Sequence, residues 1–159
     1  MDKSLIQTEK ELNLVKLTNE YKLNIVEEDP VRPHLHKAWR VLDNREVLAL
    51  ETNGKIDAVI CVAYTNQVAE SERDLQYHYS DEVQGSIAMF YTVWAYTQGS
   101  GRVLVKEAAQ RAKEKGATRF VTLSPLTPVA ERFHTRNGAK LIGKHSECQN
   151  FEYTLDNNE

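Results

Sequence analysis

The chain has 159 residues, of which 41% are hydrophobic, and a formal net charge of -3, which fits one compact domain with a buried core. Its 20 lysines and arginines are scattered among 23 acidic residues, so we do not expect the concentrated basic face that nucleic-acid binding requires. The sequence shows neither an apolar run of the ~20 residues that a membrane span needs nor a signal-peptide pattern. We therefore expect a cytoplasmic protein without a membrane or nucleic-acid partner, and a homodimer stays open.

The first part of the chain predicts a helix, a strand, a short helix and a hairpin. Residues 4–19 are charged and loosely amphipathic, which predicts a helix in an N-terminal extension covering residues 1–20. Residues 21–29 alternate apolar and polar side chains, which is typical of a half-buried strand. Helical spacing of apolar residues follows in residues 34–44, and two apolar runs then meet at Asn53-Gly54, a strong hairpin signal.

A polar segment separates the hairpin from the rest of the domain. It covers residues 66–85, and structureless loops of that length inside compact domains are uncommon and often functional. Both a lid over a binding site and a tolerated surface insertion fit the composition. Residues 86–96 then read as a long strand rich in aromatic and β-branched side chains.

The second half predicts alternating helices and strands. In residues 99–116 the side chains of Val103, Leu104, Ala108 and Ala112 fall on one helical face, with Gly116 as the C-terminal cap. Residues 118–124 form a short buried strand. A second helix follows, capped by Thr127 and started by Pro128, with Gly138 at its left-handed end, and residues 139–144 and 149–155 close the fold as strands. A mixed sheet with two packed helices in a single domain results.

The junction "AYTQGSGRVLV" carries the first functional signal. A strand ends there, two glycines permit a tight turn and a helix begins at once, so free N–H groups and the helix dipole point at one spot that suits a phosphate. The side chain of Arg102 adds a positive charge. Glycines also occur at turns for steric reasons, so the turn alone leaves anion binding and a purely structural role both open.

The long strand, this turn and the elements after it resemble the GNAT superfamily, acyl-CoA enzymes with an N-acetyltransferase fold. In the family pattern R/Q-x-x-G-x-G/A, Gly99 and Gly101 match the glycines and Tyr96 replaces Arg or Gln. The resemblance implies an α/β fold with a mixed, mostly antiparallel central sheet flanked by helices. It also implies coenzyme A or acyl-CoA as the bound small molecule, with its pyrophosphate on backbone amides of residues 98–103. The residues implied to contact it are Trp94, Ala95, Tyr96, Gln98, Gly99, Ser100, Gly101, Arg102 and Val103.

Within that superfamily the closest resemblance is to the catalytic domain of malonyl-CoA decarboxylase. The segments "FHTRNGA", "VTLSPL" and "AMFYTVW" are similar to F-H-x-x-N-G-A, S-L-S-P-I and A-I-F-Y-S-I of that family, and His134 occupies the position of the usual GNAT tyrosine. The resemblance implies that His134 is an acid or hydrogen-bond donor and that Ser124 holds the substrate carboxylate or orients the imidazole. A backbone N–H from residues 92–96 is a further donor. The family's helical insertion after the Ser-Pro segment and its N-terminal helical domain have no counterpart here.

Other functions fit the same residues. An N-acetyltransferase needs a base for the attacking amine, and Glu51 is a loose candidate. A non-catalytic coenzyme A-binding module fits the unusual Tyr96. A structural alternative makes His134 a solvent-facing residue and Ser124 a strand terminator. The pair His34 and His36 lacks a third ligand at suitable spacing, so no metal is expected.

Overall fold

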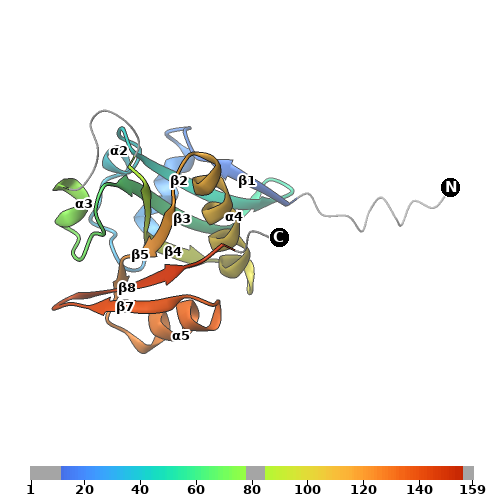
Figure 1. Cartoon of the computed structure of the whole chain (residues 1–159). Helices are drawn as coiled ribbons and strands as arrows, with labels where there is room; N and C mark the ends of the chain where they lie inside the picture. The colour runs from blue at the N-terminus through green and yellow to red at the C-terminus, as the bar shows by residue number, and fades with distance from the viewer. Residues whose placement is uncertain (1–11, 78–84, 156–159) are drawn as a thin grey trace.

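The computed structural model describes residues 12–77 and 85–155 (Figure 1). The strands are β1 (Leu12–Lys16), β2 (Arg45–Thr52), β3 (Lys55–Thr65), β4 (Ile87–Ala95), β5 (Arg119–Thr122), β6 (Ser124–Pro125), β7 (Lys140–Lys144) and β8 (Cys148–Tyr153). The helices are the 3₁₀ helix η1 (Lys22–Glu28), α2 (Lys37–Arg40), α3 (Asp74–Tyr77), α4 (Ser100–Glu114) and α5 (Pro128–Arg136).

All of these strands join one mixed sheet. Its order is β1-β2-β3-β4-β5-β8-β6, with β7 paired to β8, and β4–β5 is the parallel pair within an otherwise antiparallel arrangement. The β2–β3 hairpin turns at Asn53 (φ 52°) and Gly54 (φ 83°), because a tight hairpin turn with two left-handed residues matches the twist of its strands. The mixed, mostly antiparallel sheet and the hairpin confirm the sequence predictions.

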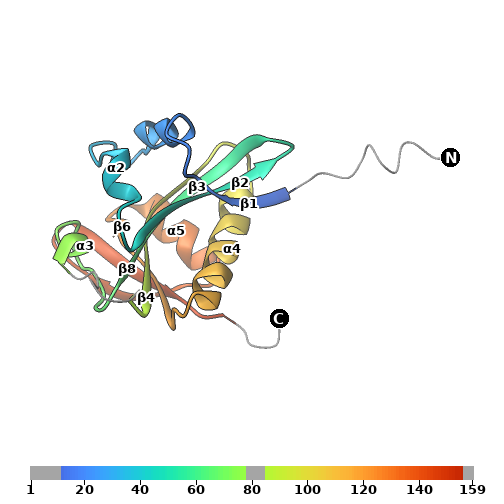
Figure 2. The ribbon, with the colours of Figure 1, turned by 90° about the horizontal axis from the view of Figure 1, so that it is seen from above.

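The sheet carries a core on each face. On β2, Leu48 and Leu50 belong to one cluster of buried side chains, and Val47 and Ala49 belong to the other, as the two-residue period of a strand requires. The first cluster includes the buried side of α4 and the half-buried Phe133 of α5. The second includes residues of η1 and α3, with α2 packed against it. Helices therefore cover both faces of the sheet, as Figure 2 shows for α4 and α2.

The ends of the two main helices follow the predicted capping signals. Thr127 Oγ1 accepts a hydrogen bond from the N–H of Ala130 at 3.2 Å, and Gly116 and Gly138 have φ values of 108° and 96°. The prediction for α4 is wrong at Val103, which is 38% exposed. The buried stripe runs through positions 101, 104, 105, 108, 109 and 112, which turns residue 103 toward the outside.

Two predictions near the N-terminus are wrong. Residues 12–16, expected in a helix, form β1, because their backbone pairs with residues 48–52 of β2; residues 1–11 lie outside the described part. Residues 21–29, expected in a strand, contain η1. Leu23 and Val26 are buried three residues apart, the spacing that a 3₁₀ helix places on one side, and the side chain of Asn19 accepts hydrogen bonds from the N–H groups of Tyr21 and Lys22.

The helix expected in residues 34–44 is shorter than predicted, and the polar segment 66–85 contains more secondary structure than predicted. The helix expected in residues 34–44 is the single turn α2, and Leu42 is 51% exposed. The polar segment 66–85 contains α3, and its Ala69 and Leu75 are fully buried in the second cluster; residues 78–84 lie outside the described part.

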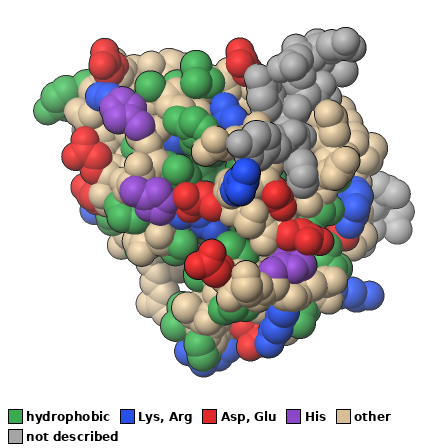
Figure 3. All heavy atoms as spheres, turned by 90° about the vertical axis from the view of Figure 1, so that its left-hand side faces the viewer, with side chains coloured by type: hydrophobic (Ala, Val, Ile, Leu, Met, Phe, Trp, Pro, Cys, Tyr) green, Lys and Arg blue, Asp and Glu red, His purple; other side chains and the backbone are tan. Residues whose placement is uncertain are grey.

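The surface carries no long apolar helix and no obvious cation site within residues 12–77 and 85–155. None of the described helices is long and apolar enough to cross a membrane. The described residues also contain no group of three His, Cys, Asp or Glu side chains placed to hold a metal ion. On the face shown in Figure 3, acidic and basic side chains are interspersed with histidines.

Candidate active-site cleft

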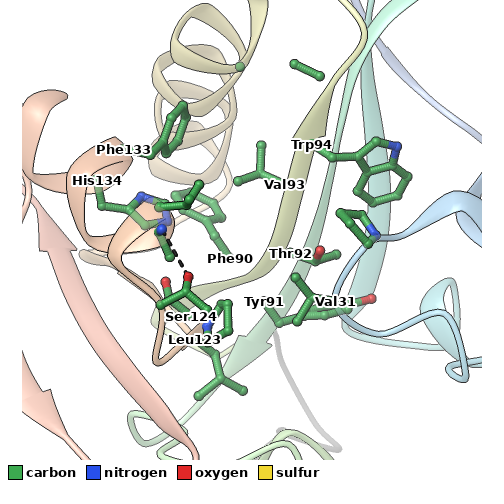
Figure 4. Close-up of a pocket in the computed structure, with 17 residues that line it drawn as sticks. Val31, Phe90, Tyr91, Thr92, Val93, Trp94, Leu123, Ser124, Phe133 and His134 are labelled. Atoms are coloured by element: carbon green, nitrogen blue, oxygen red, sulfur yellow. Dashed lines mark hydrogen bonds between the residues drawn. The ribbon is translucent and has the colours of Figure 1, made fainter.

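The site is a cleft at the point where the two parallel strands separate. Strands β4 and β5 pair from Ile87↔Arg119 to Phe90↔Thr122, and the N–H of Leu123 still donates to the Phe90 carbonyl at 2.9 Å. Beyond that bond β4 stays paired with β3 only, whereas the segment that follows β5 turns away and pairs with β8 as β6. A cleft of about 360 Å³ opens between them (Figure 4).

Five segments of the chain line this cleft. Pro30 and Val31 come from the loop after η1, residues 90–95 from β4, Gly101 from the first turn of α4, residues 123–125 from the β6 region, and the remaining side chains from the start and inner face of α5. Most of the lining is apolar. None of the seventeen lining residues, all within the described part, is Asp, Glu, Lys or Arg.

A bulge in β4 shapes one wall. The pairing with β3 passes from Val62↔Phe90 to Cys61↔Thr92, so Tyr91 is the extra residue. Bulges of this kind bend a strand and re-aim its neighbours, and they are frequent beside active sites. The bulge sits within the part of β4 that lines the cleft, so it bears directly on where the backbone N–H groups of residues 92–96 point.

His134 lies in the last turns of α5 and is 5% exposed. Its Nδ1 is 2.7 Å from the hydroxyl oxygen of Tyr153 on β8, and its ring stacks on Phe151 with 5.4 Å between centroids. Burial lowers the pKa of His134 from 6.5 to about 4, so the imidazole is neutral at pH 7. The structural alternative of a solvent-facing histidine is therefore wrong.

Ser124 lies on β6, which lines the same cleft as α5, and is 3% exposed. Its hydroxyl is 2.7 Å from the hydroxyl of Thr122, which in turn accepts a hydrogen bond from the N–H of Phe151 at 3.1 Å. Ser124 and His134 line the same cleft (Figure 4), but no hydrogen bond joins them among the contacts of the described residues. Each side chain has its own partner, so neither needs the other to hold its orientation.

The glycine turn adjoins the cleft from the side of α4. Gly99 is the N-cap of this 15-residue helix with φ 84°, and Gly101 lies so close to α5 that an added Cβ would be 3.4 Å from the Phe133 ring. The hydroxyl of Ser100 lies within hydrogen-bond distance of two carbonyl oxygens, that of Thr97 in the turn at 2.5 Å and that of Asp57 on β3 at 2.9 Å. The expected coenzyme A contacts divide accordingly. Trp94, Ala95 and Gly101 line the cleft, and Tyr96, Gln98, Gly99, Ser100, Arg102 and Val103 lie beside it.

Tyr96, which stands where Arg or Gln is usual, ties the end of β4 to the end of η1. Its hydroxyl accepts a hydrogen bond from the indole N–H of Trp94 at 3.0 Å and donates to the carboxylate of Glu28. Burial, followed by the hydrogen bond to Glu28, raises the pKa of Tyr96 above 10. This residue therefore fixes Trp94 and η1 relative to the cleft.

A buried ion pair, which sequence reasoning missed, supports the loop that forms the outer wall. The carboxylate of Asp29 is 2.8 Å from the guanidinium of Arg40, and both side chains are fully buried. The other carboxylate oxygen accepts hydrogen bonds from the N–H of Val31 and from the hydroxyl of Thr92 on β4, at 2.8 and 3.0 Å. The pair therefore holds the Pro30–Val31 wall against the strand that carries the bulge.

Arg32 extends this network to three other segments. Its guanidinium donates to the carbonyl of Tyr91 in the bulge, lies 3.8 Å from the sulfur of Cys148 on β8, and forms an ion pair at 3.2 Å with Glu72 in the long polar segment. In the sequence Asp29, Arg32 and Arg40 lie in an ordinary polar stretch, and no local pattern indicates that they are buried. By contrast Glu51, the candidate base, lies on β2 opposite Lys22 and away from the cleft.

Comparisons with known proteins identify the fold. No protein-family model matches the sequence, and no curated protein matches it. Among solved structures, malonyl-CoA decarboxylase from Agrobacterium vitis superimposes with a TM-score of 0.62 at 20% identity, over 77% of this chain and 35% of the decarboxylase. A putative GNAT acetyltransferase from Desulfovibrio desulfuricans gives a TM-score of 0.65 at 9% identity, over 90% and 98%. The acetyltransferase NAA60 from Arabidopsis thaliana, in complex with acetyl-CoA, gives 0.61 at 12%, over 90% and 98%.

The protein therefore has the GNAT fold, which confirms the prediction from sequence. Malonyl-CoA decarboxylase shares this fold, although the chain spans only about a third of the length of that enzyme.

Proposed function

We propose that the protein is an acyl-CoA-dependent enzyme that converts malonyl-CoA to acetyl-CoA and CO₂. The observation that carries the proposal is the composition of the cleft. Ser124 and a neutral His134 face the space between β4 and β6, and the lining offers no carboxylate and no cation. The reaction is a cytoplasmic one with a small-molecule substrate, and it involves no metal ion.

Such a lining favours loss of the substrate carboxylate. A carboxylate bound in an apolar cleft without a cation is poorly stabilised. Cleavage of its bond to the α-carbon removes the charge from that group, because the group leaves as neutral CO₂. The electron pair of the broken bond moves into the thioester as an enolate, which needs hydrogen-bond donors aimed at its oxygen. A proton, delivered by water, is then added to the α-carbon and gives acetyl-CoA.

Three groups at the cleft meet these needs. The imidazole of His134 keeps Nε2 for the substrate because Nδ1 is engaged by Tyr153. The hydroxyl of Ser124 orients the departing carboxylate, and a backbone N–H of residues 92–96 donates to the enolate oxygen. Ser124 and His134 act as separate contacts, since each is held by its own partner.

The coenzyme is expected to enter from the N-terminal end of α4. The N–H groups of the first turn of this 15-residue helix, together with the left-handed Gly99, form the kind of site that binds a pyrophosphate. Trp94 and Ala95 then flank the pantetheine arm in the gap between the strands. Structural neighbours in complex with CoA or acetyl-CoA support coenzyme A as the ligand.

The test is incubation of the pure protein with malonyl-CoA, with mass-spectrometric detection of acetyl-CoA. We expect acetyl-CoA to appear with the wild type and to be lost with His134→Ala and Ser124→Ala, both of which retain coenzyme A binding in a thermal-shift assay. Binding of coenzyme A without any turnover would contradict the proposal and favour a non-catalytic coenzyme A-binding module.

A second candidate is an N-acetyltransferase that moves acetyl from acetyl-CoA to an amine. It is favoured by one observation: the acetyltransferase neighbours match this chain over nearly their whole length. The cleft lacks the carboxylate that commonly serves as the base, so neutral His134 would have to take that role. Amine-dependent thiol release from acetyl-CoA, with malonyl-CoA unchanged, would replace the first proposal by this one.

A further inference from the structure

Tyr153 lies behind the cleft, on the far side of His134. It belongs to β8 and is 8% exposed, and it is not among the residues that line the cleft. Its hydroxyl oxygen nevertheless sits 2.7 Å from Nδ1 of His134, a short distance for a hydrogen bond between neutral groups. The ring of His134 is held at this bond by Phe133 and Phe151, with centroid distances of 5.0 and 5.4 Å.

The chemistry of the two partners sets the direction of this bond. The neutral imidazole has one N–H and one lone pair, and the other partner decides which nitrogen carries the proton. A phenol is a good donor and a weak acceptor, whereas an imine nitrogen is a strong acceptor, so the Tyr153 O–H donates to Nδ1.

We infer that Tyr153 is a positioning residue that holds His134 in the tautomer protonated at Nε2, so that the imidazole meets the cleft as a hydrogen-bond donor and not as a base. This inference deepens the proposed decarboxylation and rests on it for its catalytic meaning. An Nε2–H aimed at the thioester matches the enolate oxygen that forms when CO₂ leaves. Transfer of acetyl to an amine needs the opposite tautomer, with a lone pair on Nε2.

The decisive measurement needs no substrate. Long-range ¹H–¹⁵N correlation at pH 7 distinguishes protonated from unprotonated ring nitrogens, and the signals of His134 are assigned by their loss in His134→Gln. We expect a protonated Nε2 and an unprotonated, hydrogen-bonded Nδ1. A proton on Nδ1 would overturn the inference whatever activity the protein has.

Tyr153→Phe then tests the partner. Removal of the hydroxyl should shift the Nδ1 resonance to that of an imine nitrogen without a hydrogen bond, and an unchanged resonance would also overturn the inference. Turnover of malonyl-CoA should fall on the order of 10-fold through kcat, with KM within about 2-fold, because an interaction behind the reacting group orients that group and leaves substrate binding alone.

Tyr64→Phe is the matched control. Tyr64 is also a buried tyrosine, 1% exposed, whose hydroxyl donates to the carboxylate of Glu46 at 2.6 Å, away from the cleft. This variant should leave the His134 resonances and turnover unchanged. If the wild type shows the expected tautomer but malonyl-CoA stays intact, the decarboxylase proposal fails while the assignment of Tyr153 as the residue that sets the tautomer holds.

Discussion

Acid should destabilise this protein partly through a single histidine. His134 has a pKa of about 4 in the folded protein because burial disfavours its charged form, and about 6.5 when the chain is unfolded. The unfolded state therefore binds a proton between pH 6.5 and pH 4 that the folded state does not. The stabilisation is complete above pH 6.5 and is lost as the pH falls through this window.

The structure gives the size of the effect. The gap between the two pKa values is worth about 3 kcal/mol, since each pKa unit corresponds to about 1.4 kcal/mol. Roughly 2.5 kcal/mol of this should already be lost at pH 4.5. Burial is the cause of the shift, and no charged group contributes to it among the described residues, so the effect should depend little on salt.

Urea unfolding followed by tryptophan fluorescence at pH 7, 6, 5 and 4.5 measures this effect. Carboxylates such as Glu46 also titrate in acid, so the quantity of interest is the difference between the wild type and His134→Gln. We expect the wild type to lose about 2.5 kcal/mol more than the variant between pH 7 and 4.5. Parallel losses in the two proteins, or an NMR titration of His134 near pH 6.5, would show that the imidazole is not buried as described.

Three further substitutions test the supports of the cleft. Arg40→Met leaves the buried carboxylate of Asp29 without its cation and should lower the free energy of unfolding by about 3–5 kcal/mol in urea titrations; a loss below 1 kcal/mol would contradict this. Gly99→Ala meets no atom within 4 Å but strains a residue with φ 84°, so thermal unfolding should report a loss of about 1 kcal/mol. Gly101→Ala places a methyl group 3.4 Å from Phe133 inside the cleft. It should keep or raise stability yet weaken coenzyme A binding by calorimetry, and unchanged affinity would argue against the proposed path of the pantetheine arm.

The second half of the fold could be predicted because its signals are local. Thr127 caps α5 through its own hydroxyl, and Asn53 and Gly54 adopt the left-handed conformations that their turn needs. These residues carry their structural reason within a few positions of themselves. The same holds for the buried stripe of α4, where only Val103 was wrongly predicted to be buried and its neighbour Leu104 is buried.

The N-terminal segments could not be predicted because their conformation depends on distant partners. Residues 12–16 are extended because β2 offers them an edge to pair with, and nothing in their own charged pattern shows that edge. Residues 22–28 form a 3₁₀ helix because Leu23 and Val26 reach the second core cluster. Their alternating pattern favours a strand when it is considered alone.

The same division holds for the candidate site. Ser124 and His134 were identified from sequence because the motifs around them resemble a known family, and the structure places both at one cleft. The groups that hold the cleft in shape were missed. Asp29 and Arg40 are eleven positions apart in a polar stretch, and Tyr153 follows His134 by nineteen; only the packed sheet brings these partners together.

These supporting contacts also bear on which reaction the cleft favours. A GNAT fold alone is compatible with transfer of an acyl group to an amine or with loss of CO₂, because both reactions begin from a bound acyl-CoA. They differ in what they need beside the thioester: a proton acceptor in the first case and a proton or hydrogen-bond donor in the second. The lining of this cleft supplies no carboxylate to act as acceptor, and the hydroxyl of Tyr153, which we infer to be the donor, lies 2.7 Å from Nδ1 of a buried, neutral imidazole. The nitrogen that remains for the substrate is then a donor, which is the requirement of decarboxylation.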